Sequence, residues 1–234
     1  MGEVDFWQRL ASCMDESGRA VDFITVDGGE GGTGAGPLAF TDHVSLPFRI
    51  GFARVYRAMA EYDLHQKIVF VGSGRLGLPA DALLAFGMGC DMIAVAREAM
   101  LAIGCIQAQR CQSGHCPTGV ATHNRWFAHG LDAELQAEHF ANYVRAFRNE
   151  LLRLSYACGA PHPGLVQIDQ FEVLDGNFDS RPLADLFGYL PGYGLPPLVE
   201  RERIWHRYTA GRTQSVVGLP AITPVSVPAA SARA

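Results

Sequence analysis

Three cysteines lie within one short segment of the chain, at Cys105, Cys111 and Cys116. Glycines before, between and after them give the segment the freedom to fold around a bound group. Thiolates are soft ligands that favour iron–sulfur clusters or zinc, and a three-iron cluster needs one protein thiolate for each iron. In a reducing compartment the spacing C-x5-C-x4-C therefore predicts a metal site rather than disulfides.

Two other interpretations of these cysteines stay open. A zinc ion would be held if His115 joined the three thiolates, although its adjacency to Cys116 makes simultaneous ligation awkward. Alternatively the cysteines are small core residues, since free cysteine is among the most buried residue types. Three cysteines in one glycine-bearing loop make this last interpretation the weakest of the three.

A glycine-rich loop near the N-terminus is a second site where chemistry is expected. It lets the backbone approach a flat ligand closely, while Thr33 offers a hydroxyl and the carboxylates of Asp27 and Glu30 argue against a phosphate cradle. A flexible connection between a strand and a helix would explain some of the glycines, but not five in seven residues. The residues of this loop that we expect to contact a ligand are Asp27, Gly28, Gly29, Glu30, Gly31, Gly32 and Thr33.

A further loop, formed by Gly72, Ser73, Gly74 and Arg75, lacks carboxylates and leads to a helix that is expected to start at Pro79. Backbone N–H groups and the helix dipole at such a start attract anions, so we expect a phosphate group as the ligand. A plain turn between a strand and a helix explains these residues nearly as well. In βα barrels, however, phosphate commonly lies after the last two strands, which favours the phosphate interpretation if the missing strands lie upstream.

The elements that would position these loops follow from the apolar pattern. Short apolar runs at residues 21–26, 67–71 and 91–95 predict buried parallel strands. Apolar residues with helical spacing at 48–59 and 82–86 lie between the runs and complete a βαβαβα pattern, in which the second helix ends at Gly87. A further amphipathic helix after the cysteines should end near Gly159 and pack outside the strands.

Composition restricts the class of protein. The 234 residues are 48% hydrophobic and 18% charged, which is enough to bury a core of single-domain size. A net charge of -5 without a long basic run favours neither nucleic acid nor a membrane surface as partner. The acidic N-terminus does not resemble a secretory signal, and no apolar stretch is long enough to cross a bilayer, so we expect a cytoplasmic protein.

The segment from Gly104 to Thr122 resembles the three-iron cluster loop in the FMN-binding domain of the glutamate synthase family. The resemblance reaches back to the segment from Asp22 to Leu38 and covers roughly residues 20–158. It implies an α/β fold that is a partial (β/α)8 TIM barrel, about the last three βα units, with an iron–sulfur loop at 104–122. We expect the barrel part at 1–160, a C-terminal helical extension at 161–222 and a disordered tail at 223–234.

The resemblance also implies roles for the candidate residues. Cys105, Cys111 and Cys116 would hold a 3Fe-4S cluster, residues 72–75 would bind the FMN phosphate, and residues 27–33 would border the flavin and substrate. Ala96 and Arg97 resemble the family's second phosphate contact. Glu98, which follows them, stands where the family pattern has glycine, and it adds bulk and negative charge near the expected phosphate. No catalytic residue is identified.

In the family, as the resemblance implies, FMN receives electrons through the cluster and passes hydride to 2-iminoglutarate, made from 2-oxoglutarate and ammonia, to give glutamate. We expect this chain to lack the amidotransferase domain, and to lack the upstream half-barrel with its lysine-bearing strand, since residues 3–19 contain no lysine. An upstream half-barrel or an electron-donor protein is therefore an expected partner, beside the small-molecule substrate.

Three hypotheses remain at this point. The chain is the C-terminal part of a glutamate synthase-type flavoenzyme that is active only with an upstream half. Alternatively it is a remnant that retains an iron–sulfur cluster and serves in electron transfer or binding without making glutamate. In the third hypothesis it is a folded protein without cofactor whose cysteines only pack.

Overall fold

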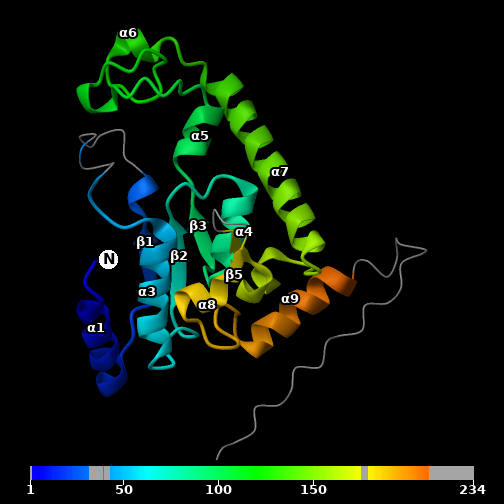
Figure 1. Cartoon of the computed structure of the whole chain (residues 1–234). Coiled ribbons are helices and arrows are strands. Elements are labelled where there is room, and N and C mark those ends of the chain that lie inside the picture. Colours follow the sequence, from blue (N-terminus) through cyan, green and yellow to red (C-terminus); the bar gives the residue numbers. More distant parts are fainter. Residues whose placement is uncertain (1, 32–38, 40–42, 175–178, 211–234) are drawn as a thin grey trace, which may run out of the picture.

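The computed structural model describes residues 2–31, 39, 43–174 and 179–210. Its centre is a parallel sheet of three strands in the order β1 (Phe23–Asp27), β2 (Val69–Ser73) and β3 (Met92–Ala94) (Figure 1). The expected α/β class and the three parallel strands are confirmed, with boundaries shifted by one or two residues. Three strands form an open sheet, so the assignment to a TIM barrel stays a prediction.

The helices that follow β1 and β2 cover one face of this sheet. Helix α3 (Phe48–Ala60) packs against β1 and β2, and helix α4 (Pro79–Gly87) packs against β3. The apolar spacing predicted both helices. The Phe52 ring is fully buried in α3, with its centroid 5.3 Å from that of Phe48 and 5.8 Å from that of Phe70 on β2. This aromatic contact is the centre of the core between helix and sheet.

The other face of the sheet is open within the described residues. Alternate residues of a strand share a face, and on β1 the side chains of Ile24 and Val26 are buried while the side chain of Phe23 is 63% exposed. Val69, which lies opposite Phe23, is 41% exposed, and Met92 on β3 is 59% exposed. Large apolar side chains therefore lie next to one another on an uncovered surface, which is typical of an interaction site.

Helix α7 (Ala133–Ala157) forms an outer layer. It begins at Asp132, whose side chain accepts the backbone N–H groups of Glu134 and Leu135 at 3.1 Å, and it ends just before Gly159, as predicted. Figure 1 shows it running beside α4 and α5 (Arg97–Ala102), the two helices that it contacts. The expectation that this helix lies outside the strands is consistent with these contacts.

The sequence did not predict a helix before β1 or an antiparallel strand pair after α7, and it predicted a helical C-terminal extension without the bounds of its helices. The segment before β1 forms helix α1 (Val4–Ser17), which packs on α3 and ends at Gly18, a residue with a φ of 64°. The C-terminal extension contains an antiparallel strand pair and two helices. These elements are β4 (Glu172–Leu174), β5 (Ser180–Pro182), α8 (Leu183–Phe187) and α9 (Leu198–Ala210). The expected tail at 223–234 lies outside the described residues.

The remaining elements are short. One helical turn, α6 (Arg125–Ala128), follows the cysteine segment, and the described residues include 3-10 turns at Gly29–Gly31, Cys111–Ser113, Pro163–Leu165 and Ile168–Gln170. Among the described helices, none has both the length and the apolar character needed to cross a membrane.

Replacing Phe52 by Ala should lower the free energy of unfolding by about 3–5 kcal/mol, because a fully buried ring is lost from the core between α3 and β2. Phe23→Ala is the matched control, and this exposed ring on the open face should cost the isolated chain less than about 1 kcal/mol. Urea unfolding of the two variants measures both values. Equal losses would contradict the assignment of one covered and one open face.

Candidate functional site

The three segments predicted to contact FMN, at residues 27–33, 72–75 and 96–97, begin where the three strands end, at the carboxyl edge of the sheet. Asp27 lies opposite Ser73, and Ser73 lies opposite Ala94, so β1, β2 and β3 end side by side. The Gly28 N–H donates to the Ser73 carbonyl at 2.8 Å, which holds the first loop on the second. Segments far apart in the sequence are thereby brought together at the edge where ligands bind in βα folds.

Arg97 connects the third segment to the first. Its Nη2 donates to the Gly31 carbonyl at 3.1 Å, although the two residues are 66 positions apart. This contact holds Arg97 at the predicted site, where one of its nitrogens is used by the protein itself. Gly32 and Thr33, the last two residues predicted for the first loop, lie outside the described residues.

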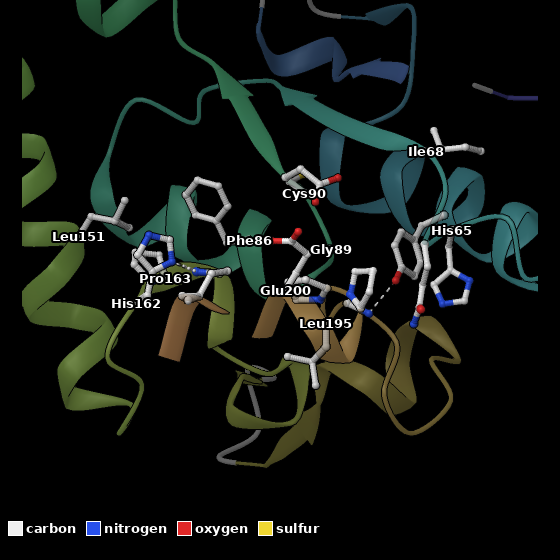
Figure 2. A pocket seen from close by; sticks show the side chains of 18 residues that line it. His65, Ile68, Phe86, Gly89, Cys90, Leu151, His162, Pro163, Leu195 and Glu200 are labelled. Atoms are coloured by element: carbon white, nitrogen blue, oxygen red, sulfur yellow. Dashed lines mark hydrogen bonds between the residues drawn. The ribbon is translucent and has the colours of Figure 1, made fainter. Parts of the chain in front are cut away.

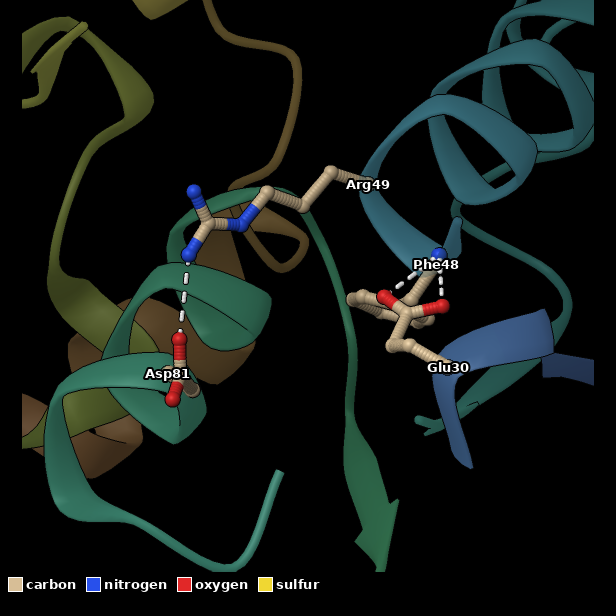
Figure 3. A network of polar contacts seen from close by, with 4 residues as sticks. All are labelled: Glu30, Phe48, Arg49 and Asp81. Carbon is tan, nitrogen blue, oxygen red and sulfur yellow. Dashed lines mark hydrogen bonds and ion pairs between the residues drawn. The ribbon is translucent and has the colours of Figure 1, made fainter. Parts of the chain in front are cut away.

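Glu30 has a structural role that sequence reasoning missed. Figure 3 shows its carboxylate directed at the first residue of α3, where both oxygens lie 2.8 Å from the Phe48 backbone nitrogen. The first N–H groups of a helix have no partner within the helix, and the helix dipole favours a negative charge there. Glu30 thus anchors the glycine-rich loop to α3, whether or not it also borders a ligand.

Gly28 is required by the same contact. A Cβ at position 28 would lie 2.6 Å from the Phe48 nitrogen and 2.5 Å from Oε2 of Glu30, closer than real Cβ contacts. Part of the glycine content of this loop therefore comes from packing against α3 rather than from ligand binding.

The second loop, at residues 72–75, lies before the start of α4 and carries the cation Arg75, and both could bind an anion. In the described part of the chain, no side chain is hydrogen-bonded to the start of α4, and its first helical position is Pro79. Arg75 is exposed, with a φ of 53°, and its guanidinium makes no ion pair or hydrogen bond within the described residues. Asp81 in the first turn of α4 is already paired with Arg49 on α3 at 3.0 Å (Figure 3). A free guanidinium beside an uncapped helix N-terminus fits an anion such as a phosphate.

Glu98 lies close to this predicted phosphate position. Its side chain packs so tightly against Gly77 that a Cβ at position 77 would overlap its carboxylate. Tyr143 on α7 donates its hydroxyl to the Gly77 carbonyl at 2.7 Å, and its pKa is raised, first by burial and then by the charge of Glu98. The Glu98 carboxylate thus lies against Gly77, a residue between Arg75 and the start of α4 in the chain, and the phosphate position itself stays a prediction.

The cysteine segment follows α5 and forms a loop with several left-handed backbone positions, at Gly104, Gln107, Gln109, Gly114 and Gly119. All three cysteines are free thiols. The hydrogen bond with the Thr118 hydroxyl lowers the pKa of the buried Cys116 thiol to about 7; burial opposes this effect, and nearby backbone N–H groups add to it. This environment suits a thiolate, the form in which cysteine binds metal.

The donor chemistry of this loop fits an iron–sulfur cluster, since three thiols lie in one segment and one is stabilised as a thiolate. Within the described residues, no three His, Cys, Asp or Glu side chains lie together as a ready-made metal site. His115, the alternative zinc ligand, has its ring centroid 6.3 Å from that of Phe127. Both the cluster and the zinc interpretation stay predictions.

Comparison with known proteins gives a consistent result. Residues 10–160 match the family model described as the conserved region in glutamate synthase. The chain is 35% identical over 162 residues to the glutamate synthase large subunit-like protein YerD of Bacillus subtilis, covering 69% of this chain and 31% of that protein. It is also 35% identical over 158 residues to an archaeal glutamate synthase [NADPH] of Methanocaldococcus jannaschii, covering 68% and 29%.

A ferredoxin-dependent glutamate synthase from Antithamnion sp. is 37% identical over 101 residues, which cover 43% of this chain and 7% of that protein. The matched region thus spans less than a third of the length of each of these relatives.

Replacing Glu30 by Ala should lower the free energy of unfolding by about 1 kcal/mol, because the Phe48 N–H loses its acceptor and the α3 dipole loses a favourable charge. Glu30→Gln keeps an acceptor and should lose less. Glu61→Ala removes the same charge from the opposite end of α3 and should be neutral or slightly stabilising. Hydrogen exchange of the Phe48 amide provides a local readout, and unchanged protection in Glu30→Ala would refute the cap.

Proposed function

The chain belongs to the glutamate synthase family, and we propose that it forms the FMN- and cluster-binding part of a glutamate synthase-like oxidoreductase. The observation that carries this proposal is the meeting of three predicted loops at the carboxyl edge of one parallel sheet. Many unrelated surfaces contain a glycine-rich turn, but the joint placement of all three segments is what a bound cofactor requires.

FMN would be held through its phosphate at the start of α4. Arg75 supplies a guanidinium that is unpaired within the described residues, the Gly72 to Arg75 loop supplies backbone N–H groups at the same edge of the sheet, and Arg97 provides a second cation nearby. The first loop, from Asp27 to Gly31, would then border the flavin and the substrate. Glu98 works against this arrangement, because its negative charge lies against Gly77.

Cys105, Cys111 and Cys116 would hold a 3Fe-4S cluster, with one thiolate for each iron. When both groups are bound, they supply the redox chemistry: electrons from a reduced donor, and hydride to 2-iminoglutarate made from 2-oxoglutarate and ammonia. The chain itself positions the groups through the sheet edge and stabilises the Cys116 thiolate through Thr118. It would also fix the flavin phosphate at the start of α4.

The open face of the sheet supports a further part of the proposal, that activity needs additional strands. Phe23, Val69 and Met92 expose large apolar side chains on the face opposite α3 and α4. In a closed βα barrel such side chains fill the interior, and the strands at both edges are paired. We propose that an upstream half-barrel, in the same or a separate chain, covers this face and completes the site.

The test is anaerobic purification followed by assays for iron, acid-labile sulfide and FMN. Iron and sulfide together with FMN would support the redox role. A cluster without flavin would indicate the non-catalytic electron-transfer or binding remnant instead. Absence of all three, also after reconstitution with iron, sulfide and FMN, would refute the proposal.

Cys111→Ser should abolish cluster assembly, because one iron would lose its thiolate. The iron content should fall from about three per chain to near zero, with the same loss of acid-labile sulfide and visible absorption. Cys13→Ser, at an exposed cysteine on α1, is the control and should retain the iron content of the unmodified chain. An unchanged iron-to-protein ratio in Cys111→Ser would rule out the cysteine assignment.

Arg75→Ala should weaken FMN binding by about tenfold or more, because a charge-assisted hydrogen bond to the phosphate is lost. Glu98→Gln should strengthen it by roughly fivefold, since a like charge near the phosphate is removed. Arg54→Ala, at an exposed position of α3, should leave the affinity unchanged. Quenching of flavin fluorescence on binding gives the dissociation constants, and identical values for Arg75→Ala and the unmodified chain would exclude the proposed phosphate loop.

A further inference from the structure

A pocket lies at the end of the sheet opposite the cofactor loops. Its volume is about 350 Å³, and it is lined by 18 residues, ten of which are labelled in Figure 2. Ile68, Cys90 and Asp91 in its wall directly precede β2 and β3, so the pocket faces the amino ends of the strands. The predicted FMN loops leave the carboxyl ends of the same strands, and the pocket is therefore separate from the site described above.

The pocket is built jointly by the family region and the C-terminal extension. Half of its lining residues follow residue 160, where the match to the family model ends. His162, Leu195 and Glu200 are examples, and they close the pocket from the side opposite Cys90 and Ile68 (Figure 2).

The charges around the pocket favour a cation. Asp91 and Glu200 line it, while no lysine or arginine of the described part of the chain does. Each of the two carboxylates has a contact within the described residues. Oδ2 of Asp91 accepts the Phe70 N–H at 2.8 Å, and Glu200 pairs with the exposed Arg203 on the same helix. Burial lowers the pKa of His65 and of His162, so both rings are neutral near pH 7 and add no positive charge. Burial also raises the pKa of Asp91, and the hydrogen bond from the Phe70 N–H opposes that shift.

The remaining wall favours an apolar body on that cation. Phe86, Leu151 and Ile204 contribute hydrocarbon surface. Tyr56, which is only 2% exposed and stacks on Tyr189 at 5.3 Å, adds a rigid aromatic edge to this wall.

His65 adds an unsatisfied polar atom to this wall. Its Nδ1 is buried and has no hydrogen-bond partner in the described part of the chain. Buried polar atoms normally have a partner, and a ligand in the pocket would supply one.

We propose that this pocket binds a small organic monocation, with its ammonium group at Asp91 and Glu200 and an apolar body against Phe86, Leu151 and Ile204. The volume is near the lower end of those that hold small molecules, which suits an amine of metabolite size. Because half of the wall is the C-terminal extension, binding ties the extension to the βα core. Neither FMN nor the cluster takes part in this site.

The test is isothermal titration calorimetry with three probes that share one body, namely phenethylamine, 2-phenylethanol and phenylacetate. The amine should bind, the neutral alcohol should bind about tenfold or more weakly, and the anion should give no binding heat. Equal affinity of amine and alcohol would overturn the cation assignment. No binding of the amine up to about 10 mM would overturn the site itself.

Glu200→Gln and Asp91→Asn should each weaken phenethylamine binding, while the amide oxygen introduced by the second substitution would still accept the Phe70 N–H. Glu202→Gln is the matched control, since it removes the same charge from an exposed position of α9 that does not line the pocket. If all three variants bind the amine as the unmodified chain does, the proposed carboxylates are wrong. Flavin and iron contents measured on the same samples should not change, which separates this test from that of the proposed function.

Discussion

Phe48, the first residue of α3, makes the contact on which the loop end of the fold depends. Its side chain is 1% exposed, and its backbone N–H is held by Glu30 at 2.8 Å. A Cβ at Gly72 would lie 2.9 Å from the Phe48 ring, and one at Gly74 would lie 3.0 Å from the Phe48 Cβ. Two loops from different strands can approach this closely only because they lack side chains at the points of contact. The packing of one aromatic residue thus determines how near the ends of β1 and β2 can come.

This packing leaves positive groups exposed at the carboxyl edge of the sheet, where they can attract an anion. With the loops pressed against Phe48, the start of α4 and the guanidinium of Arg75 are left at the surface, while Arg97 reaches the Gly31 carbonyl at 3.1 Å. Close positive groups at a helix N-terminus make an anion site. Glu98 reduces this effect, because its carboxylate packs against Gly77, and the balance between these charges decides how well FMN binds in the proposed function.

The two ends of the sheet are closed by different parts of the chain. The carboxyl end is formed by residues within the match to the family model, and the amino end is closed by a segment that follows that match. Between them, the face carrying Phe23, Val69 and Met92 is open in the described residues. An α/β sheet is normally covered on both faces, since each exposed apolar side chain keeps water in contact with hydrocarbon. The proposed half-barrel and the proposed amine site therefore use surfaces that do not overlap.

Local sequence determined the strands, the helices α3, α4 and α7, and the family, because apolar periodicity and distinctive motifs are properties of neighbouring residues. It also indicated which loops leave the strands toward one edge, since parallel strands end together. Tertiary structure alone decided that Glu30 caps α3, that Arg97 holds Gly31, and that the extension closes a pocket over Asp91 and Cys90. Each of these contacts joins residues 18 to more than 100 positions apart. Such contacts depend on how the elements pack against one another, and no local pattern records that packing.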